Sequence, residues 1–173
     1  MIHKKLQSGF SLIEMVVYVS IFAMLAVVVI NSYMVIVASF NKTQTNRDLQ
    51  ESGNAVMERI SREIRQAKSI TVANSTLGTT PGTLEMATTD ASGTSATVKF
   101  ILESGGVNIY SNGTLIGNLV GQNVTATSLI FRQMTTTAGT GVKVELTLQD
   151  ARGKEHRTEN FYDTVILRWD YLI

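Results

Sequence analysis

The sequence predicts an α+β protein in which one long N-terminal helix packs on an antiparallel β-sheet. Two observations predict the helix: residues 15–41 carry no charge, and residues 49–67 repeat apolar side chains at spacings of three and four. A third observation predicts the sheet, because apolar and polar residues alternate in short runs after residue 97. A helix followed by a series of strands is the order of an α+β fold.

The composition of the 173-residue chain excludes several function classes. There is no cysteine, so neither a disulfide framework nor a thiolate metal site can form. The formal charge of +1 gives no overall attraction to nucleic acid or to anionic lipid. Apolar residues are concentrated in the first 40 residues, and Thr, Ser, Asn and Gly dominate the remainder. The two parts therefore require separate interpretation.

The uncharged segment from Met15 to Asn41 is long enough to span a membrane, since a bilayer core of about 30 Å takes about 20 apolar residues as a helix. A secretory signal peptide has a shorter apolar region that ends at a small-x-small site, for which Val37-Ala38-Ser39 is a marginal match. A buried core helix is the other alternative, but all faces of this segment are apolar. We expect one membrane span with the N-terminus inside and the C-terminus outside.

A short motif lies between a basic leader, residues 1–9, and the apolar run. Its sequence, Gly9-Phe10-Ser11-Leu12-Ile13-Glu14, resembles the processing motif of type IV prepilins. In that family a membrane-embedded aspartyl peptidase cuts after the glycine and methylates the new N-terminal phenylalanine. The resemblance implies cleavage between Gly9 and Phe10, N-methylation of Phe10, and a type IV pilin fold in which the first half of the helix is transmembrane.

Glu14 places a carboxylate near the start of the predicted membrane helix. Strongly polar charged groups cost roughly 2.5 to 3.5 kcal/mol at mid-bilayer and less near the helix end. Such a residue requires a partner, and the resemblance implies that this is the Phe10 ammonium of a neighbouring subunit. The alternative is that Glu14 reaches the membrane interface or is protonated.

Beyond the membrane segment the helix is predicted to become amphipathic. One apolar stripe comprises Leu49, Gly53, Val56, Ile60, Ile64 and Ala67, so we expect one helix from about Ser11 to Lys68, roughly 85 Å long. Gly53 costs about 1 kcal/mol relative to alanine in a helix interior, which makes it the expected place for a kink.

Basic residues on this second part of the helix raise the possibility of nucleic-acid contact. Their spacing of three drifts around the helix, and Glu58 and Glu63 are interleaved with them. Glu58 with Arg62, and Arg59 with Glu63, form i,i+4 pairs. The pattern therefore favours a solvated, salt-bridged face.

The C-terminal part is predicted to form the sheet. Residues 69–97 are expected to be a Thr/Ser-rich connection with one short strand at 83–87. Asn112-Gly113 predicts a two-residue hairpin turn, because both turn positions need positive φ. Further strands are expected at residues 98–103, 129–131, 142–149 and 164–169. Another turn is expected at 150–154.

The order of these strands resembles minor pilins of the W type and J-type pseudopilins of type II secretion. The resemblance lies in Val124 before Leu129-Ile130-Phe131, then 142–148, then Phe161 ahead of 165–168. The sequence lacks a proline in the membrane helix and a C-terminal cysteine pair, both common in major pilins. These departures favour a minor subunit.

No catalytic constellation stands out. His156, the one histidine outside the leader, lies in a polar run expected to be a solvated loop. Four acidic residues cluster in sequence, but without EF-hand spacing, and we expect neither a metal nor a cofactor. They are Asp150, Glu155, Glu159 and Asp163.

The predicted organisation has five parts. These are the leader 1–9, the transmembrane or filament-core half of the helix 10–41, its amphipathic half 42–68, the connection 69–97 and the sheet domain 98–173. The expected function is that of a structural, non-enzymatic minor subunit of a type IV pilus or type II secretion pseudopilus that helps to initiate or prime assembly. Two alternatives stay open: an adhesive or DNA-uptake pilin, and a membrane-anchored sensor or enzyme with an uncleaved anchor.

The resemblance also implies partners and a location. The expected partners are the prepilin peptidase, other pilin or pseudopilin subunits and the inner-membrane assembly platform, and we expect no nucleic acid. The subunit is expected in the inner membrane and then in a periplasmic or extracellular filament.

Overall fold

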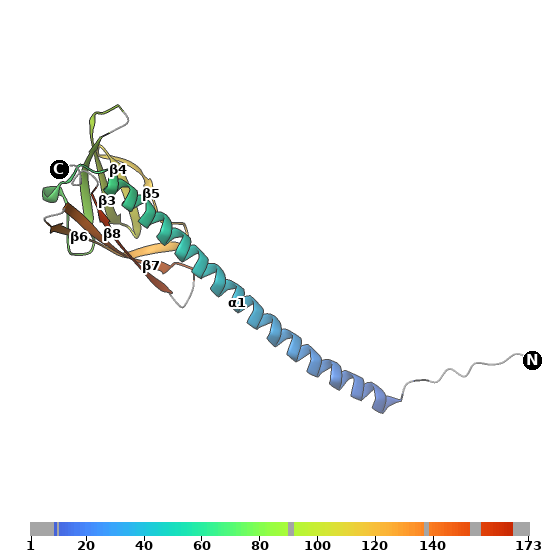
Figure 1. The fold of residues 1–173 in the computed structure, drawn as a ribbon. Coiled ribbons are helices and arrows are strands. Elements are labelled where there is room, and N and C mark those ends of the chain that lie inside the picture. The colour runs from blue at the N-terminus through green and yellow to red at the C-terminus, as the bar shows by residue number, and fades with distance from the viewer. Residues whose placement is uncertain (1–8, 10, 90–91, 137–138, 153–156, 168–173) are drawn as a thin grey trace, which may run out of the picture. The chain divides into compact units, whose positions relative to one another are not determined.

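The computed structural model describes residues 9, 11–89, 92–136, 139–152 and 157–167 (Figure 1). The chain divides into two units, residues 1–44 and residues 45–173, and each is described by itself. Helix α1 runs from Leu12 to Gln66 and contributes to both units. The predicted long helix is therefore confirmed.

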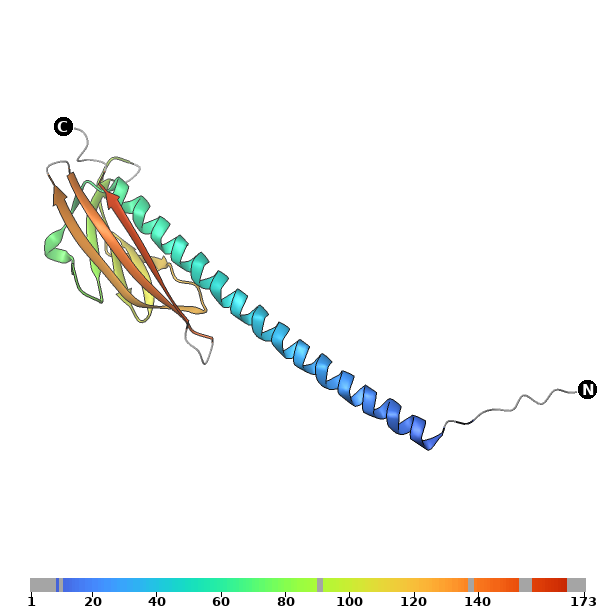
Figure 2. The same ribbon diagram turned by 60° about the horizontal axis from the view of Figure 1, so that its bottom comes forward.

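In the part of the chain that the structure describes, eight strands follow the helix and form two antiparallel sheets. The five-stranded sheet has the order β1-β2-β3-β4-β5, with β1 Ser69–Ile70, β2 Thr83–Thr89, β3 Ser95–Glu103, β4 Gly106–Ser111 and β5 Thr114–Asn118. The three-stranded sheet has the order β6-β7-β8, with β6 Val124–Thr136, β7 Gly139–Asp150 and β8 Thr158–Ile166. Figure 2 shows these three long strands side by side. The predicted α+β class is confirmed, and the strands form two sheets instead of one.

The two sheets meet along β6. The backbone N–H of Gly78 donates to Phe131 O and that of Gly82 donates to Leu129 O, both at 2.8 Å. Ala126 N–H donates to Gly105 O at the same distance. Loops of the first sheet thus satisfy backbone groups on the edge of the second, as buried backbone requires.

The hairpin predicted at Asn112-Gly113 is confirmed. It joins β4 to β5, with φ of 49° at Asn112 and 80° at Gly113. The Asn112 side chain also accepts a 2.8 Å hydrogen bond from the backbone N–H of Thr97 in β3.

The segment expected to be a connection, 69–97, contains β1, a short 3-10 helix η1 at Val72–Asn74, β2 and the start of β3. The strand predicted at 83–87 is present and extends to Thr89. Leu84 and Met86 are fully buried, so this strand contributes two core side chains. The Thr and Ser residues around them obscured the alternating pattern.

One hydrophobic core joins the Thr45–Gln66 part of α1 to both sheets. The predicted stripe is buried in full, and Met57 and Ser61 are buried beside it. The largest fully buried side chains come from the helix, from five strands and from the residue after β8: Leu49, Ile60, Ile64, Leu84, Met86, Phe100, Ile109, Leu129, Phe131, Leu146, Leu148 and Leu167. Each such burial contributes about 1.5 to 3 kcal/mol.

Helix α1 continues through Gly53 without a break. A Cβ at this position would overlap the ring of Phe161 from β8. The absence of a side chain at Gly53 therefore allows α1 to pack closely against β8.

Candidate processing and assembly site

The residues of the predicted cleavage motif lie at the start of α1. Gly9 is exposed and outside regular secondary structure, and a Cβ there would meet no atom within 4 Å. Phe10 lies outside the described residues. The Ser11 carbonyl accepts the hydrogen bond of Met15 N–H at 3.2 Å, so the helix begins directly after it. The predicted scissile bond thus precedes the first helical turn.

Glu14 lies in the first turn of α1 and is exposed. A carboxylate there interacts favourably with the positive end of the helix dipole. The hydroxyl of Tyr18, one turn later, donates a long hydrogen bond of 3.4 Å to Glu14 Oε1. The carboxylate is therefore held at the helix start while remaining open to a second donor.

Apart from Glu14 and a few hydroxyl and amide groups, the surface of α1 from Leu12 to Phe40 is apolar, and it is exposed. By length and composition the helix could cross a membrane, and none of its most apolar window is buried. Its hydroxyls donate to the carbonyl four residues earlier: Ser20 to Val16 at 2.7 Å and Ser32 to Val28 at 2.9 Å. Such internal pairing is what a hydrocarbon environment requires of polar groups.

The acidic residues of the C-terminal cluster engage different turns of α1 rather than a common centre. Thr45 donates to Asp150 at 3.4 Å, Gln50 to Glu159 at 3.0 Å, and Ser61 to Asp163 at 2.5 Å. Glu155 and His156 lie outside the described residues. Among the residues that are described, no group of three or more His, Asp and Glu side chains could hold a metal ion.

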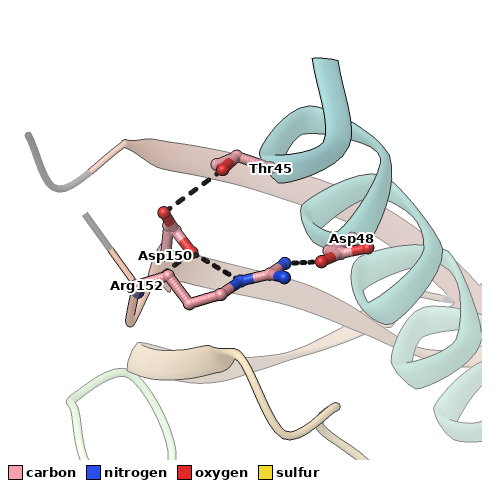
Figure 3. A network of polar contacts seen from close by, with 4 residues as sticks. All are labelled: Thr45, Asp48, Asp150 and Arg152. Atoms are coloured by element: carbon pink, nitrogen blue, oxygen red, sulfur yellow. Dashed lines mark hydrogen bonds and ion pairs between the residues drawn. The ribbon is translucent and has the colours of Figure 1, made fainter. Parts of the chain in front are cut away.

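A polar network that was not predicted from the sequence connects α1 near residue 45 to the end of β7 (Figure 3). Asp150, at the end of β7, accepts from Thr45 and lies 3.9 Å from Arg152 Nε. The guanidinium of Arg152 also pairs with Asp48 on α1. The network fastens the β7–β8 turn to the helix, and it joins residues about a hundred positions apart, which no local pattern reveals.

The two predicted ion pairs of the helix are confirmed. Arg59 pairs with Glu63 at 2.8 Å, and Arg62 pairs with Glu58 at 2.7 Å. Two of the basic residues considered for nucleic-acid contact are thus engaged with neighbouring carboxylates.

Comparison with known proteins identifies the N-terminal segment. The family described as "Prokaryotic N-terminal methylation motif" matches residues 4–30, which include the predicted cleavage point and the start of the apolar helix. No curated protein and no solved structure matches the chain.

The chain thus has an N-terminal methylation motif of the type IV prepilin kind, followed by a pilin-like arrangement of a long apolar helix and antiparallel sheets. The motif implies processing by a prepilin peptidase and association with a pilus system. Proteins of this kind are typically non-enzymatic structural subunits. The narrower likeness to W-type or J-type subunits finds no support in these comparisons.

Proposed function

We propose that this protein is a structural, non-enzymatic subunit of a type IV pilus or type II secretion pseudopilus, released from its leader by cleavage between Gly9 and Phe10. The observation that carries the proposal is the methylation motif placed directly before an exposed apolar helix. The motif supplies the processing step, and the helix supplies a segment suited first to lipid and then to a filament core.

Cleavage would create the α-amine of Phe10, which has a reference pKa near 8 and is cationic at neutral pH. We propose that this amine pairs with Glu14 of a neighbouring subunit during assembly. Supporting this role, Glu14 lies in the first helical turn and is exposed, with Tyr18 as a weak intrachain donor. Charge pairing would remove the cost of carrying the carboxylate into an apolar core.

Mass spectrometry of the mature N-terminus tests the processing step. The expected chain begins at Phe10 and carries one added methyl group, and Gly9→Leu should block cleavage. Because a side chain at Gly9 meets no neighbouring atom, the loss would report recognition by the peptidase and not misfolding. The leader variant Gln7→Ala is the matched control and should be cleaved. An uncleaved wild-type chain would favour a membrane-anchored sensor or enzyme instead.

Glu14→Gln tests the pairing. This variant should be cleaved normally but enter filaments at least tenfold less well, equivalent to about 1.4 kcal/mol. Tyr18→Phe, which removes the hydroxyl that donates to Glu14, should assemble as the wild type does. Normal incorporation of a correctly cleaved Glu14→Gln chain would refute the pairing.

We further propose that the subunit helps to initiate assembly as a minor component. The absence of a C-terminal cysteine pair and of a proline in the apolar helix supports this role over that of a major subunit. Deleting the protein in its native host should lower the number of filaments per cell and leave their length unchanged. Shorter filaments at an unchanged number would indicate a role in elongation.

The motif and the uncharged helix support a location in the inner membrane, with the N-terminus in the cytoplasm and residues 45–173 outside. Inner-membrane assembly proteins and other pilin subunits are the expected partners there. Protease added to spheroplasts should digest the C-terminal domain, while in intact cells the outer membrane should protect any unassembled subunit.

A further inference from the structure

A pocket lies on the face of the five-stranded sheet that points away from the core. Side chains of β2, β3 and β4 alternate between the core and this outer face, where Glu85, Lys99 and Tyr110 lie side by side in register. The pocket has a volume of about 340 Å³, within the range of small-molecule sites. Its described lining residues are Glu85, Thr97, Lys99, Ile101, Tyr110 and Gly113.

Neighbouring contacts hold two of the lining side chains in place. Asn74 Nδ2 donates to Glu85 Oε1 at 2.6 Å, and the backbone N–H of Glu85 donates to Ser75 Oγ at 2.9 Å. The hydroxyl of Tyr110 donates to Glu103 Oε2 at 3.3 Å. The carboxylate of Glu85 and the ring of Tyr110 are therefore positioned before a ligand arrives, which lowers the entropy cost of binding.

Lys99 and Glu85 keep free hydrogen-bonding groups toward the pocket. Although Glu85 is the register partner of Lys99, the Lys99 ammonium forms no ion pair in the described part of the chain. Asn74 occupies one oxygen of Glu85, and the other oxygen has no donor among the described residues. A free donor thus lies on the strand next to a free acceptor.

We propose that this pocket binds a neutral carbohydrate. A sugar hydroxyl is both a donor and an acceptor, so one hydroxyl can donate to Glu85 and another can accept from Lys99. The ring of Tyr110 provides an amphipathic surface for the C–H face of the sugar. Gly113 leaves room beside it, since a Cβ there would meet no atom within 4 Å. One ammonium and one carboxylate balance in charge, so the pocket does not favour an anionic ligand.

This inference goes beyond the proposed function, because recognition of a carbohydrate would give an assembled subunit the adhesive role that the sequence leaves open. The lining residues all belong to the unit of residues 45–173, and none of them lies in α1. Cleavage and assembly can therefore fail while carbohydrate binding stands, and the reverse is equally possible.

Ligand-observed NMR with the full chain in detergent micelles tests the proposal. The detergent must have a headgroup that is not a sugar, so that it does not compete for the pocket. The probes are neutral oligosaccharides of glucose, of galactose and of N-acetylhexosamines, with sulfated and uronic-acid oligosaccharides as the anionic set. At least one neutral probe should bind in the millimolar range or tighter. Failure of every neutral probe to bind, or preferential binding of the anionic set, would overturn the proposal.

Substitutions in the lining locate the site. Tyr110→Ala and Lys99→Met should each weaken binding of the best neutral probe by about tenfold. Tyr110→Phe should bind as the wild type does, because the Tyr110 hydroxyl is engaged by Glu103. Tyr162→Ala is the matched control on the other sheet, where Lys143 Nζ lies 5.8 Å from the centre of the Tyr162 ring, and it should also bind normally. Equal losses in Tyr110→Ala and Tyr162→Ala would overturn the assignment of the pocket.

A variant that fills the pocket keeps the test independent of folding. Thr97 is exposed, so Thr97→Trp should leave thermal unfolding unchanged while its side chain occupies the space of the ligand. Binding of the best neutral probe should fall by about tenfold although Glu85, Lys99 and Tyr110 are all retained. Wild-type binding by the folded Thr97→Trp chain would show that the carbohydrate binds elsewhere and would refute the proposal.

Discussion

The two halves of helix α1, residues 12–44 and residues 45–66, are both regular helix but differ in whether their apolar side chains are exposed or buried. In residues 12–44 the apolar side chains are exposed, with Phe22 at 73%, and hydroxyls donate to the helix's own carbonyls. In residues 45–66 the apolar side chains Ile60 and Ile64 are fully buried, and Ser61 donates to Asp163 on a strand.

This difference indicates which contacts stabilise each half. The second half exposes polar residues and buries one stripe against sheets of the same chain, as an amphipathic helix does. The first half is apolar on every face, so a single stripe against its own domain could not cover it. Its stability must come from lipid or from other subunits, in agreement with the proposed function.

The largest expected effect on unfolding compares the loss of one aromatic ring in each half of α1's surroundings, one buried in the core and one exposed. Phe131→Ala should lower the free energy of unfolding of the C-terminal unit by about 3 to 5 kcal/mol, because the fully buried ring leaves a cavity in the core. Phe22→Ala should change that free energy by less than about 0.5 kcal/mol. Denaturant titration of both variants in detergent, followed by near-UV circular dichroism, measures the difference. Similar losses of unfolding free energy in the two variants would contradict the conclusion that only the second half of α1 is stabilised by the C-terminal unit.

The same contrast explains what the sequence could predict. The stripe from Leu49 to Ala67 and the Asn112-Gly113 hairpin follow from local periodicity and turn chemistry, and both are present. The uncharged segment and the methylation motif are local as well. Each of these features is encoded in one short run of consecutive residues.

Features that depend on distant contacts were not predictable. For Gly53 the sequence indicates only a low helix propensity, whereas a Cβ at this position would overlap the ring of Phe161, which lies far along the chain. The acidic residues near the C-terminal end cluster in sequence, but the partner of Asp163 is Ser61 on α1, which donates a hydrogen bond to it from about a hundred positions away. The division into two sheets follows from loop hydrogen bonds to β6, which leave no periodic signal in the sequence.

The next largest effect tests close packing in the second half of α1. Gly53→Ala should destabilise the C-terminal unit by about 1 to 3 kcal/mol despite the higher helix propensity of alanine, because its methyl group overlaps the Phe161 ring. Thermal or denaturant unfolding measures the loss.

A double variant identifies the cause. When Phe161→Ala is already present, Gly53→Ala should cost nothing or should stabilise by up to about 1 kcal/mol, as helix propensity predicts. An additive pair of losses would show that the glycine has a different role. The matched control is Ala55→Gly on the same helix, which should cost about 1 kcal/mol through propensity alone.

An intermediate effect is expected for the polar contact between helix and strand. Ser61 is buried, and its hydroxyl donates to Asp163 at 2.5 Å. Ser61→Ala should cost about 1 to 3 kcal/mol of unfolding free energy, since a partly buried carboxylate loses a donor. Ser32→Ala, which removes a hydroxyl bonded within the first half, should leave domain unfolding unchanged. Equal costs for the two serines would mean that the halves are energetically linked.

The smallest effects concern ion pairs, which differ in what they join. Arg152 connects the β7–β8 turn to Asp48 on α1, beside the buried carboxylate of Asp150. Arg62 and Glu58 pair within one exposed helix face. Arg152→Ala should therefore lower the free energy of unfolding by about 1 kcal/mol, and Arg62→Ala by about 0.3 to 0.5 kcal/mol.

Raising the ionic strength to 1 M should remove the cost of Arg62→Ala and reduce that of Arg152→Ala only in part, because partly buried charges are less screened. If salt removed both costs equally, the Arg152 contact would act as an ordinary surface pair, and the attachment of the helix to the sheet would rest on its apolar stripe alone.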